Sequence, residues 1–461
     1  MTATKLGILG ICGVLSIATM ACGKKVEEEA GSTTAEVKTK DVDGVETTVK
    51  MKAGKGVDLE KKVVTIGALN DESGPGAAIG KPFADGKRLA VAVVNAGGIL
   101  PEGWTVKLVE KDHGYNPQKS VQEFNAIKDS VLYIASSFGT PNTLPLRDML
   151  ERENMMAFPA SLSSQMASHR STPPLGASYV VETQRAADWA VADAGDASKV
   201  KAGIIYQKDD YGEDGLKGLK LAAAHHGFDI VSEQTISPGQ KDVTAAITSL
   251  KGKGANYVFL TVLPSTTGAI LGTAAATKFA PKWIGNTATW VDVFFSEKSP
   301  LPAKVLTNFH WVNGLPFWGE DLPGMDAFLK AYEAHKDELG TGRPDFYTLV
   351  SYVQGMVQFE ALRRAIDNGD ITRKGFMSGL QSIKKFTAGG LLNPMDMSLF
   401  PYQTNNHARV LKPDFAKKSW TVVADYALPL SLNSKGEGSK VEDKKDTPPA
   451  VAKPVEATGT E

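Results

Sequence analysis

Strand-like and helix-like segments alternate along most of this chain, and this alternation constrains the fold more than any other feature. A β-rich run at 63–69 leads through a Gly- and Pro-rich loop to a helical stretch at 82–95 and a second strand at 104–109. The order recurs in strands near 131–135, 155–158, 201–206, 229–234, 257–261 and 283–284, separated by helices near 141–153, 213–226, 242–253 and 265–278. Such alternation predicts an α/β fold with parallel sheets covered by helices on both faces. Because a Ser-, Pro- and Gly-rich loop interrupts the pattern before 179–184, we expect two sheets.

Length and composition agree with two cores and exclude some functions. The chain has 461 residues, 42% of them hydrophobic and 22% charged, which is typical of a folded globular protein. Lys and Arg number 51 against 52 Asp and Glu, so the net charge of −1 offers no basic surplus for a nucleic-acid partner. Both cysteines, Cys12 and Cys22, lie at the N-terminus, which excludes a disulfide framework, a thiolate metal site and a cysteine nucleophile from the body.

The two ends of the chain differ in composition from the middle. A lysine followed by a short apolar run predicts a signal peptide over 1–21, and an alanine before Cys22 resembles the lipidation motif of bacterial lipoproteins. Plain cleavage after Ala21 is the alternative. Residues 22–60 and 433–461 have few large apolar side chains, so we expect a lipidated terminus with a flexible tether at one end and a disordered tail at the other.

Hydroxyl-rich loops follow two neighbouring strands in the first half of the body. Loops 136–141 and 158–164 each follow an apolar strand, and ligands of parallel sheets bind beyond such strand ends. Hydroxyls and free backbone N–H groups there favour an anion such as a carboxylate, although the same residues can simply cap helices. Tyr211, in the loop after the strand at 201–206, is a candidate to close over a ligand, or is an exposed loop tyrosine without a role.

Motifs for nucleotide-dependent and hydrolytic enzymes fail on inspection. The loop Gly74–Gly80 has Ile79 in place of the third glycine of a dinucleotide-binding motif, and Gly80-Lys81 lacks the Ser or Thr of a phosphate-binding loop. Neither a Gly-x-Ser-x-Gly nor a His-Glu-x-x-His pattern occurs. We therefore expect no cofactor, no metal and no enzymatic activity.

Three long segments resemble one family. The stretches "VTIGALNDESGPGAAIGKPFADGKRLAVAVVNAGGI", "IASSFGTPNTLPLRDMLERENMMAFPAS" and "AGIIYQKDDYGEDGLKGLKLAAAHHGFDIVSEQ" are similar to the branched-chain amino-acid-binding family of ABC-importer substrate-binding proteins. The resemblance implies a periplasmic-binding-protein type I fold: two doubly wound parallel-sheet lobes, joined by a three-strand hinge, with a ligand cleft between them. It places crossings near 181, 313 and 391, giving lobe one as 63–181 plus 314–390 and lobe two as 182–313 plus 391–427.

The resemblance also implies a ligand site. It assigns the carboxylate of a ligand to the two hydroxyl-rich loops and the lid to Tyr211; the ligand-binding residues it predicts are Ser137, Gly139, Thr140, Ala160, Ser161, Tyr211 and Thr287. Amino-acid binders of the family usually place an acid where this chain has Thr287. A buried ammonium without a counter-ion costs several kcal/mol, so an α-amino-acid ligand is placed in doubt unless Asp209, Asp210 or Glu213 supplies the missing acid. Aromatic or aliphatic carboxylates or amides are the other option.

The resemblance implies a function in solute capture. We expect an exported protein, periplasmic or at the cell surface, which is lipid-anchored, monomeric and delivers a small molecule to an ABC permease and ATPase complex. A ligand-sensing partner of a receptor is the alternative, and an exported α/β enzyme is a distant third.

Overall fold

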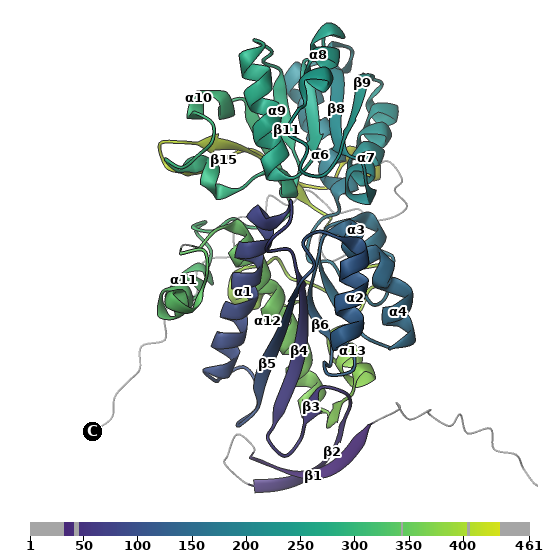
Figure 1. The fold of residues 1–461 in the computed structure, drawn as a ribbon, viewed down its shortest axis with the longest axis vertical. Coiled ribbons are helices and arrows are strands. Elements are labelled where there is room, and N and C mark those ends of the chain that lie inside the picture. The colour runs from purple at the N-terminus through teal and green to yellow at the C-terminus, as the bar shows by residue number, and fades with distance from the viewer. Residues whose placement is uncertain (1–31, 41–45, 343, 403–405, 434–461) are drawn as a thin grey trace, which may run out of the picture.

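The computed structural model describes residues 32–40, 46–342, 344–402 and 406–433, which form two stacked lobes (Figure 1). The predicted signal peptide, Cys22 and the tail beyond Asn433 lie outside the described residues. None of the described helices is long and apolar enough to cross a lipid bilayer.

Lobe one is built on a five-stranded sheet. Strands β5, β4, β6 and β7 run parallel in that spatial order, and the short β3 pairs antiparallel with β4. The strands are β3 (Val57–Asp58), β4 (Val63–Asn70), β5 (Thr105–Asp112), β6 (Ile134–Phe138) and β7 (Ala157–Ala160). All of β6 is buried, because helices cover both faces of the sheet. The helices are α1 (Ala77–Asn95), α2 (Pro117–Ile127), α3 (Thr140–Thr143), α4 (Arg147–Arg152), α5 (Ser164–Ala167), α11 (Met325–His335), α12 (Phe346–Asp367) and α13 (Arg373–Gln381).

Lobe two is built on a seven-stranded sheet in the order β15-β14-β12-β11-β10-β8-β9. The five strands from β12 to β9 are parallel, as the alternation predicts, and the hairpin of β14 and β15 adds two antiparallel strands at one edge. The strands are β8 (Lys201–Gln207), β9 (Asp229–Ile236), β10 (Tyr257–Thr261), β11 (Lys282–Gly285), β12 (Phe309–Asn313), β14 (Ala408–Asp414) and β15 (Ser419–Ala427). The helices are α6 (Tyr179–Ala194), α7 (Asp210–His226), α8 (Thr244–Gly252), α9 (Pro264–Ala276), α10 (Ala303–Leu306) and α14 (Leu430–Asn433).

The first and third crossings between the lobes differ from the expected positions. Val181 lies inside α6, which packs on α7 and β14 of lobe two, so the first crossing precedes this helix. Beyond 391 the chain stays on lobe one, because the Tyr402 N–H donates to the Ala167 carbonyl at 2.9 Å. The chain therefore returns to lobe two only between Tyr402 and Ala408, where β14 begins.

The helix expected at 141–153 is interrupted. The structure has α3 and α4 on either side of a 3₁₀ turn, Leu144–Leu146, that contains Pro145. Proline lacks an N–H group and clashes with the preceding turn, which explains the break.

The segment expected to be a flexible tether contains two strands. β1 (Thr33–Lys40) and β2 (Glu46–Ala53) form an antiparallel hairpin, and β2 also pairs with β13 (Asp370–Ile371) at the end of lobe one farthest from lobe two (Figure 1). Val37, Met51 and Ala53 are buried. The expectation is therefore wrong for this stretch, because single alternating apolar residues are buried by a partner strand more than 300 positions away in the chain.

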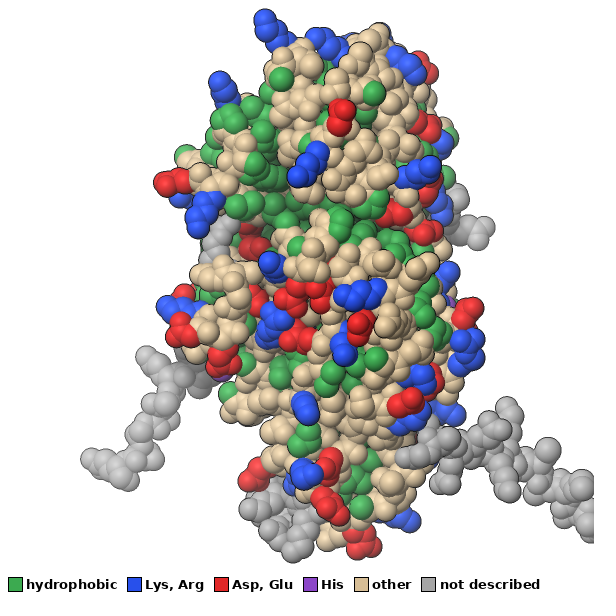
Figure 2. Space-filling model, viewed as in Figure 1, with side chains coloured by type: hydrophobic (Ala, Val, Ile, Leu, Met, Phe, Trp, Pro, Cys, Tyr) green, Lys and Arg blue, Asp and Glu red, His purple; other side chains and the backbone are tan. Residues whose placement is uncertain are grey.

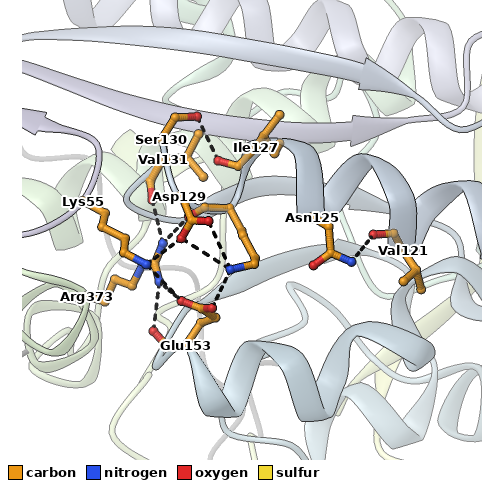
Figure 3. A network of polar contacts seen from close by, with 10 residues as sticks. Lys55, Val121, Asn125, Ile127, Asp129, Ser130, Val131, Glu153 and Arg373 are labelled. Atoms are coloured by element: carbon orange, nitrogen blue, oxygen red, sulfur yellow. Dashed lines mark hydrogen bonds and ion pairs between the residues drawn. The ribbon is translucent and has the colours of Figure 1, made fainter. Parts of the chain in front are cut away.

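A polar network fixes the chain just after this hairpin (Figure 3). Lys55 Nζ lies 2.6 Å from Asp129 Oδ1, and Lys128 Nζ lies 2.8 Å from Glu153 Oε1. Arg373 is almost fully buried and donates to Glu153 Oε2 at 2.8 Å and to the Val131 carbonyl at 3.2 Å. The hydrogen bond from Lys128 is the main cause that lowers the pKa of Glu153 below its usual value.

Arg373→Met should destabilise the protein by about 3–5 kcal/mol, because it leaves buried carbonyls without their donor and removes one of the cationic partners of Glu153. The measurement is denaturant unfolding at neutral pH. Arg363→Met is the matched control. This partly exposed arginine pairs with Glu360 and Asp367 of its own helix, so its loss should cost less than about 1 kcal/mol. Equal effects of the two variants would contradict a special role for the buried network.

Candidate ligand site between the lobes

A cavity of about 60 Å³ lies at the junction of the lobes. Hydrophobic side chains also gather along this junction on the molecular surface (Figure 2). Both lobes contribute to the lining, which consists of Ile79, Phe83, Tyr115, Phe138, Gly139, Thr140, Pro159, Ala160, Ser161, Leu162, Leu175, Tyr179, Tyr211, Leu263, Thr287, Ala288, Leu315, Phe346, Tyr347, Val350 and Gln354. The structure thus brings six of the seven predicted ligand-binding residues to one cavity; their role in binding stays a prediction.

The two hydroxyl-rich loops of lobe one lie side by side because β6 and β7 are parallel neighbours. Thr140 begins α3 directly after β6, and Ser161 follows β7. Their hydroxyl oxygens are 2.7 Å apart, and both side chains are buried. This pair forms a polar spot on an otherwise largely apolar wall.

Gly139 has a φ of +87°, a region that side chains rarely adopt. A Cβ atom at this position would lie 2.9 Å from the ring of Tyr115 and 2.7 Å from Asn142 Nδ2, so only glycine fits.

Ser137 is the one predicted residue that does not line the cavity. Its hydroxyl is fully buried and bonds to Thr143 Oγ1 at 2.8 Å, so it braces the loop from behind.

On lobe two, Tyr211 lies at the start of α7, whose first turn is capped by the Asp209 carboxylate. The Tyr211 hydroxyl donates to Asn286 Oδ1 at 2.9 Å and lies 3.2 Å from the Val262 carbonyl. The Tyr211 ring packs edge-on against Tyr179 with centroids 4.7 Å apart. The tyrosine predicted as a lid therefore is a buried wall residue that is held on several sides.

Thr287 follows β11 and carries no charge, but a carboxylate lies directly behind it. The Thr287 N–H donates to Glu182 Oε2 at 3.0 Å, and the Thr287 hydroxyl bonds to Glu182 Oε1. Burial raises the pKa of Glu182 to about 8, while donors on Thr287 and the Gly314 N–H pull the pKa back down. Sequence reasoning sought an acid among Asp209, Asp210 and Glu213 and missed Glu182.

The three acids sought in sequence lie elsewhere. The Asp209 carboxylate accepts the N–H groups of Tyr211 and Gly212, Asp210 accepts a hydrogen bond from Gln165 at 3.2 Å, and Glu213 is exposed. Within the described part of the chain, every side chain that lines the cavity is uncharged. Nor do the described residues contain a group of three or more His, Cys, Asp and Glu side chains arranged for a metal ion.

Helix α12 supplies lining residues that the sequence did not reveal. The Tyr347 hydroxyl reaches lobe two and lies 2.9 Å from the Thr287 carbonyl and 2.7 Å from that of Trp290. Gln354 donates to the Pro159 carbonyl at 3.0 Å and accepts a hydrogen bond from the buried Lys87 at 3.3 Å. Gln354 lies 195 residues beyond Pro159 and Tyr347 lies 60 residues beyond Thr287, so no local motif points to these contacts.

Direct contacts hold the lobes together. Asp214 of α7 accepts hydrogen bonds from the N–H and, at 2.7 Å, from the hydroxyl of Ser164 on lobe one. Gln207 Nε2 donates to the Tyr115 hydroxyl at 3.2 Å across the same cleft. The structure is therefore a closed arrangement of the two lobes.

Two parallel-sheet lobes, joined by three crossings and closed on a cavity at their strand ends, define the periplasmic-binding-protein type I fold. A family model described as "Periplasmic binding protein" matches residues 63–411, and the chain belongs to this family of solute-binding proteins. The resemblance noted from the sequence is confirmed.

Relatives and solved structures agree with this membership. The chain is 28% identical over 201 residues to "Leu/Ile/Val-binding protein homolog 3" of Brucella melitensis, a match that covers 42% of this chain and 53% of that protein. It is 22% identical over 300 residues to "Amino acid binding protein" of Pseudomonas aeruginosa, covering 63% of this chain and 75% of that protein. The chain thus spans about half the length of the Brucella relative.

Two solved structures show the likeness of the fold. One is a "Fatty acid ABC transporter substrate-binding protein from Thermomonospora curvata", with a TM-score of 0.76 and 23% identity, covering 86% of this chain and 98% of that one. The other is a branched-chain amino acid ABC transporter protein from Thermus thermophilus with bound valine, with a TM-score of 0.70 and 18% identity, covering 82% and 99%.

Asp214 of lobe two bonds to Ser164 of lobe one, and this contact exists only when the lobes are closed. Asp214→Ala removes it and should therefore favour an open arrangement. Small-angle scattering of the unliganded protein should then give a larger radius of gyration than wild type. Asp210→Ala removes a contact at the exposed rim and serves as the control that should leave the radius unchanged. An unchanged radius for Asp214→Ala would contradict its role in closure.

Glu182→Gln should alter the pH dependence of stability. The pKa of Glu182 is raised in the folded state, so its contribution is fully present below the ordinary value of 4.5 and is lost as pH rises through about 8. Between pH 5 and pH 8, the free energy of unfolding of wild type should therefore fall by a few kcal/mol relative to that of Glu182→Gln. Unfolding at a series of pH values tests this, and parallel curves for the two proteins would refute it.

Proposed function

We propose that this protein is the extracytoplasmic solute-binding component of an ABC importer. In this proposal it captures a branched-chain amino acid or a related small carboxylate or amide by cleft closure and delivers it to a membrane permease. The cavity carries the proposal: it is enclosed between two lobes, mainly apolar, uncharged at its surface, and provided with hydroxyls at defined points. Such a site suits a small molecule with an apolar body and few polar groups.

The relatives support the ligand class. Proteins similar to this chain are named for binding Leu, Ile and Val, and the structural neighbours include one named for fatty acids and one with bound valine. These ligands share a carboxylate on an apolar body. We assign the carboxylate to the Thr140 and Ser161 hydroxyls, which already lie 2.7 Å apart and can turn toward an anion.

Export and anchoring belong to the same proposal. The short apolar run at 6–18, within the predicted signal peptide, and Cys22 suit a lipidated N-terminus that keeps the protein near its permease. Lipidation would add an acyl mass at Cys22, which mass spectrometry of membrane-extracted protein detects; Cys22→Ser should release the protein from the membrane.

The ligand is identified by native mass spectrometry of the purified protein before and after unfolding, dialysis and refolding. We expect a bound small carboxylate or amide that dialysis removes. Recovery of a nucleotide or a sugar phosphate instead would refute the proposed class.

Thr140→Val and Ser161→Ala should each weaken binding of the recovered ligand by about 1–3 kcal/mol, because a carboxylate loses a charge-assisted hydrogen bond. Isothermal titration calorimetry measures the change. Ser137→Ala is the control, since that hydroxyl lies in the same loop but does not line the cavity. Wild-type affinity in both test variants would disprove the carboxylate assignment.

A further inference from the structure

Three of the hydroxyl groups that line the cavity, on Thr287, Tyr211 and Tyr347, bond to groups of lobe two. The hydroxyl of Tyr179, also in the lining, instead pairs with Ser161 of lobe one. A hydroxyl has one proton to donate and two lone pairs to accept with, so the direction of its proton decides what it offers a ligand. In each of the first three groups the proton is directed away from the cavity, toward a buried acceptor.

The two tyrosine hydroxyls have different acceptors, but both direct their proton away from the cavity. The Tyr211 hydroxyl has Asn286 Oδ1 at 2.9 Å and the Val262 carbonyl at 3.2 Å, and neither Asn286 nor Val262 lines the cavity. The Tyr347 hydroxyl has the carbonyls of Thr287 and Trp290 at 2.9 and 2.7 Å. Carbonyl oxygens only accept, so both phenols present lone pairs to a ligand.

Thr287 depends on Glu182, which lies outside the cavity. One carboxylate oxygen accepts the Thr287 N–H at 3.0 Å and the other accepts the Thr287 hydroxyl. With Glu182 ionised, Thr287 also has only lone pairs left for the cavity. The carboxylate further adds negative charge behind this end, where no charged side chain of the described lining opposes it.

We propose that Glu182 is a specificity-determining positioning residue, which in its ionised form makes the lobe-two end of the cavity a hydrogen-bond acceptor. The ligand must then carry a donor there, such as an ammonium, hydroxyl or amide N–H group, in addition to the carboxylate assigned to lobe one. This inference rests on the proposed function and narrows its ligand class. It departs from the expectation, based on Thr287 alone, that an amine is not recognised.

The proposal predicts a change of polarity on a single substitution. In Glu182→Gln, the amide oxygen accepts the Thr287 N–H, and the amide NH₂ donates to the Thr287 hydroxyl oxygen. The Thr287 proton is then released toward the cavity. That end of the site should therefore accept a ligand carbonyl in the variant and disfavour it in the wild type.

Two probes of equal charge and nearly equal size test this: the 2-hydroxy and 2-oxo analogues of leucine, with leucine itself as a third. The 2-hydroxy acid has a donor where the 2-oxo acid has only an acceptor. Calorimetry above pH 8, where Glu182 is ionised, should show wild type binding the 2-hydroxy acid and leucine about tenfold or more tighter than the 2-oxo acid. In Glu182→Gln this preference for the 2-hydroxy acid and leucine over the 2-oxo acid should disappear or reverse.

Thr287→Val should likewise abolish the preference for the 2-hydroxy acid over the 2-oxo acid. Thr287→Ser, which keeps the hydroxyl, should retain that preference. Thermal melts show whether each variant is folded, and the ratio between probes does not depend on a general loss of affinity. Wild type that binds the 2-oxo acid as tightly as the 2-hydroxy acid and leucine would overturn this inference and leave solute capture intact. Binding of none of the three probes would overturn the proposed carboxylate class and this inference with it.

Discussion

The parallel orientation of the strands determines where the chemistry of this protein lies. In both lobes the carboxyl ends of β-strands meet the junction, so Thr140, Ser161, Tyr211 and Thr287 reach one cavity although they come from different loops. An antiparallel arrangement would direct neighbouring loops to opposite edges of the sheet. The position of the site is thus set by the parallel pairing of the strands, independently of which side chains line it.

The cavity has an uncharged surface with an ionisable carboxyl group placed one layer behind it. A carboxylate at the surface of so small and apolar a space would lose its hydration whenever no ligand is bound. Behind Thr287, the Glu182 carboxyl group instead has donors on Thr287 and Gly314, which belong to the protein itself. Gly314 directly follows β12 at the second crossing, so the same group touches the hinge and the wall of the site.

Closure relies on a few buried polar contacts rather than on surface ion pairs. The bonds between Asp214 and Ser164, and between Tyr347 and the carbonyls near Thr287, join the lobes where water is scarce. Hydrogen bonds in such surroundings are electrostatically stronger than hydrogen bonds exposed to water. At the other end of lobe one, the buried guanidinium of Arg373 holds several segments in the same manner (Figure 3).

The α/β class, the parallel sheets and the two hydroxyl-rich loops at strand ends could be predicted from the sequence, because strand periodicity and loop composition are local properties. The six predicted residues that line the cavity followed from the resemblance to the family, which extended those loops to a ligand site. The sequence did not reveal Glu182, Tyr347 or Gln354, whose positions follow from the packing of helices α6 and α12 against segments distant in the sequence. Nor did it reveal that β2 pairs with β13, since single alternating apolar residues carry little signal without their partner. Those features depend on contacts between segments far apart in the chain, and only the tertiary structure decides which distant side chains share a buried space.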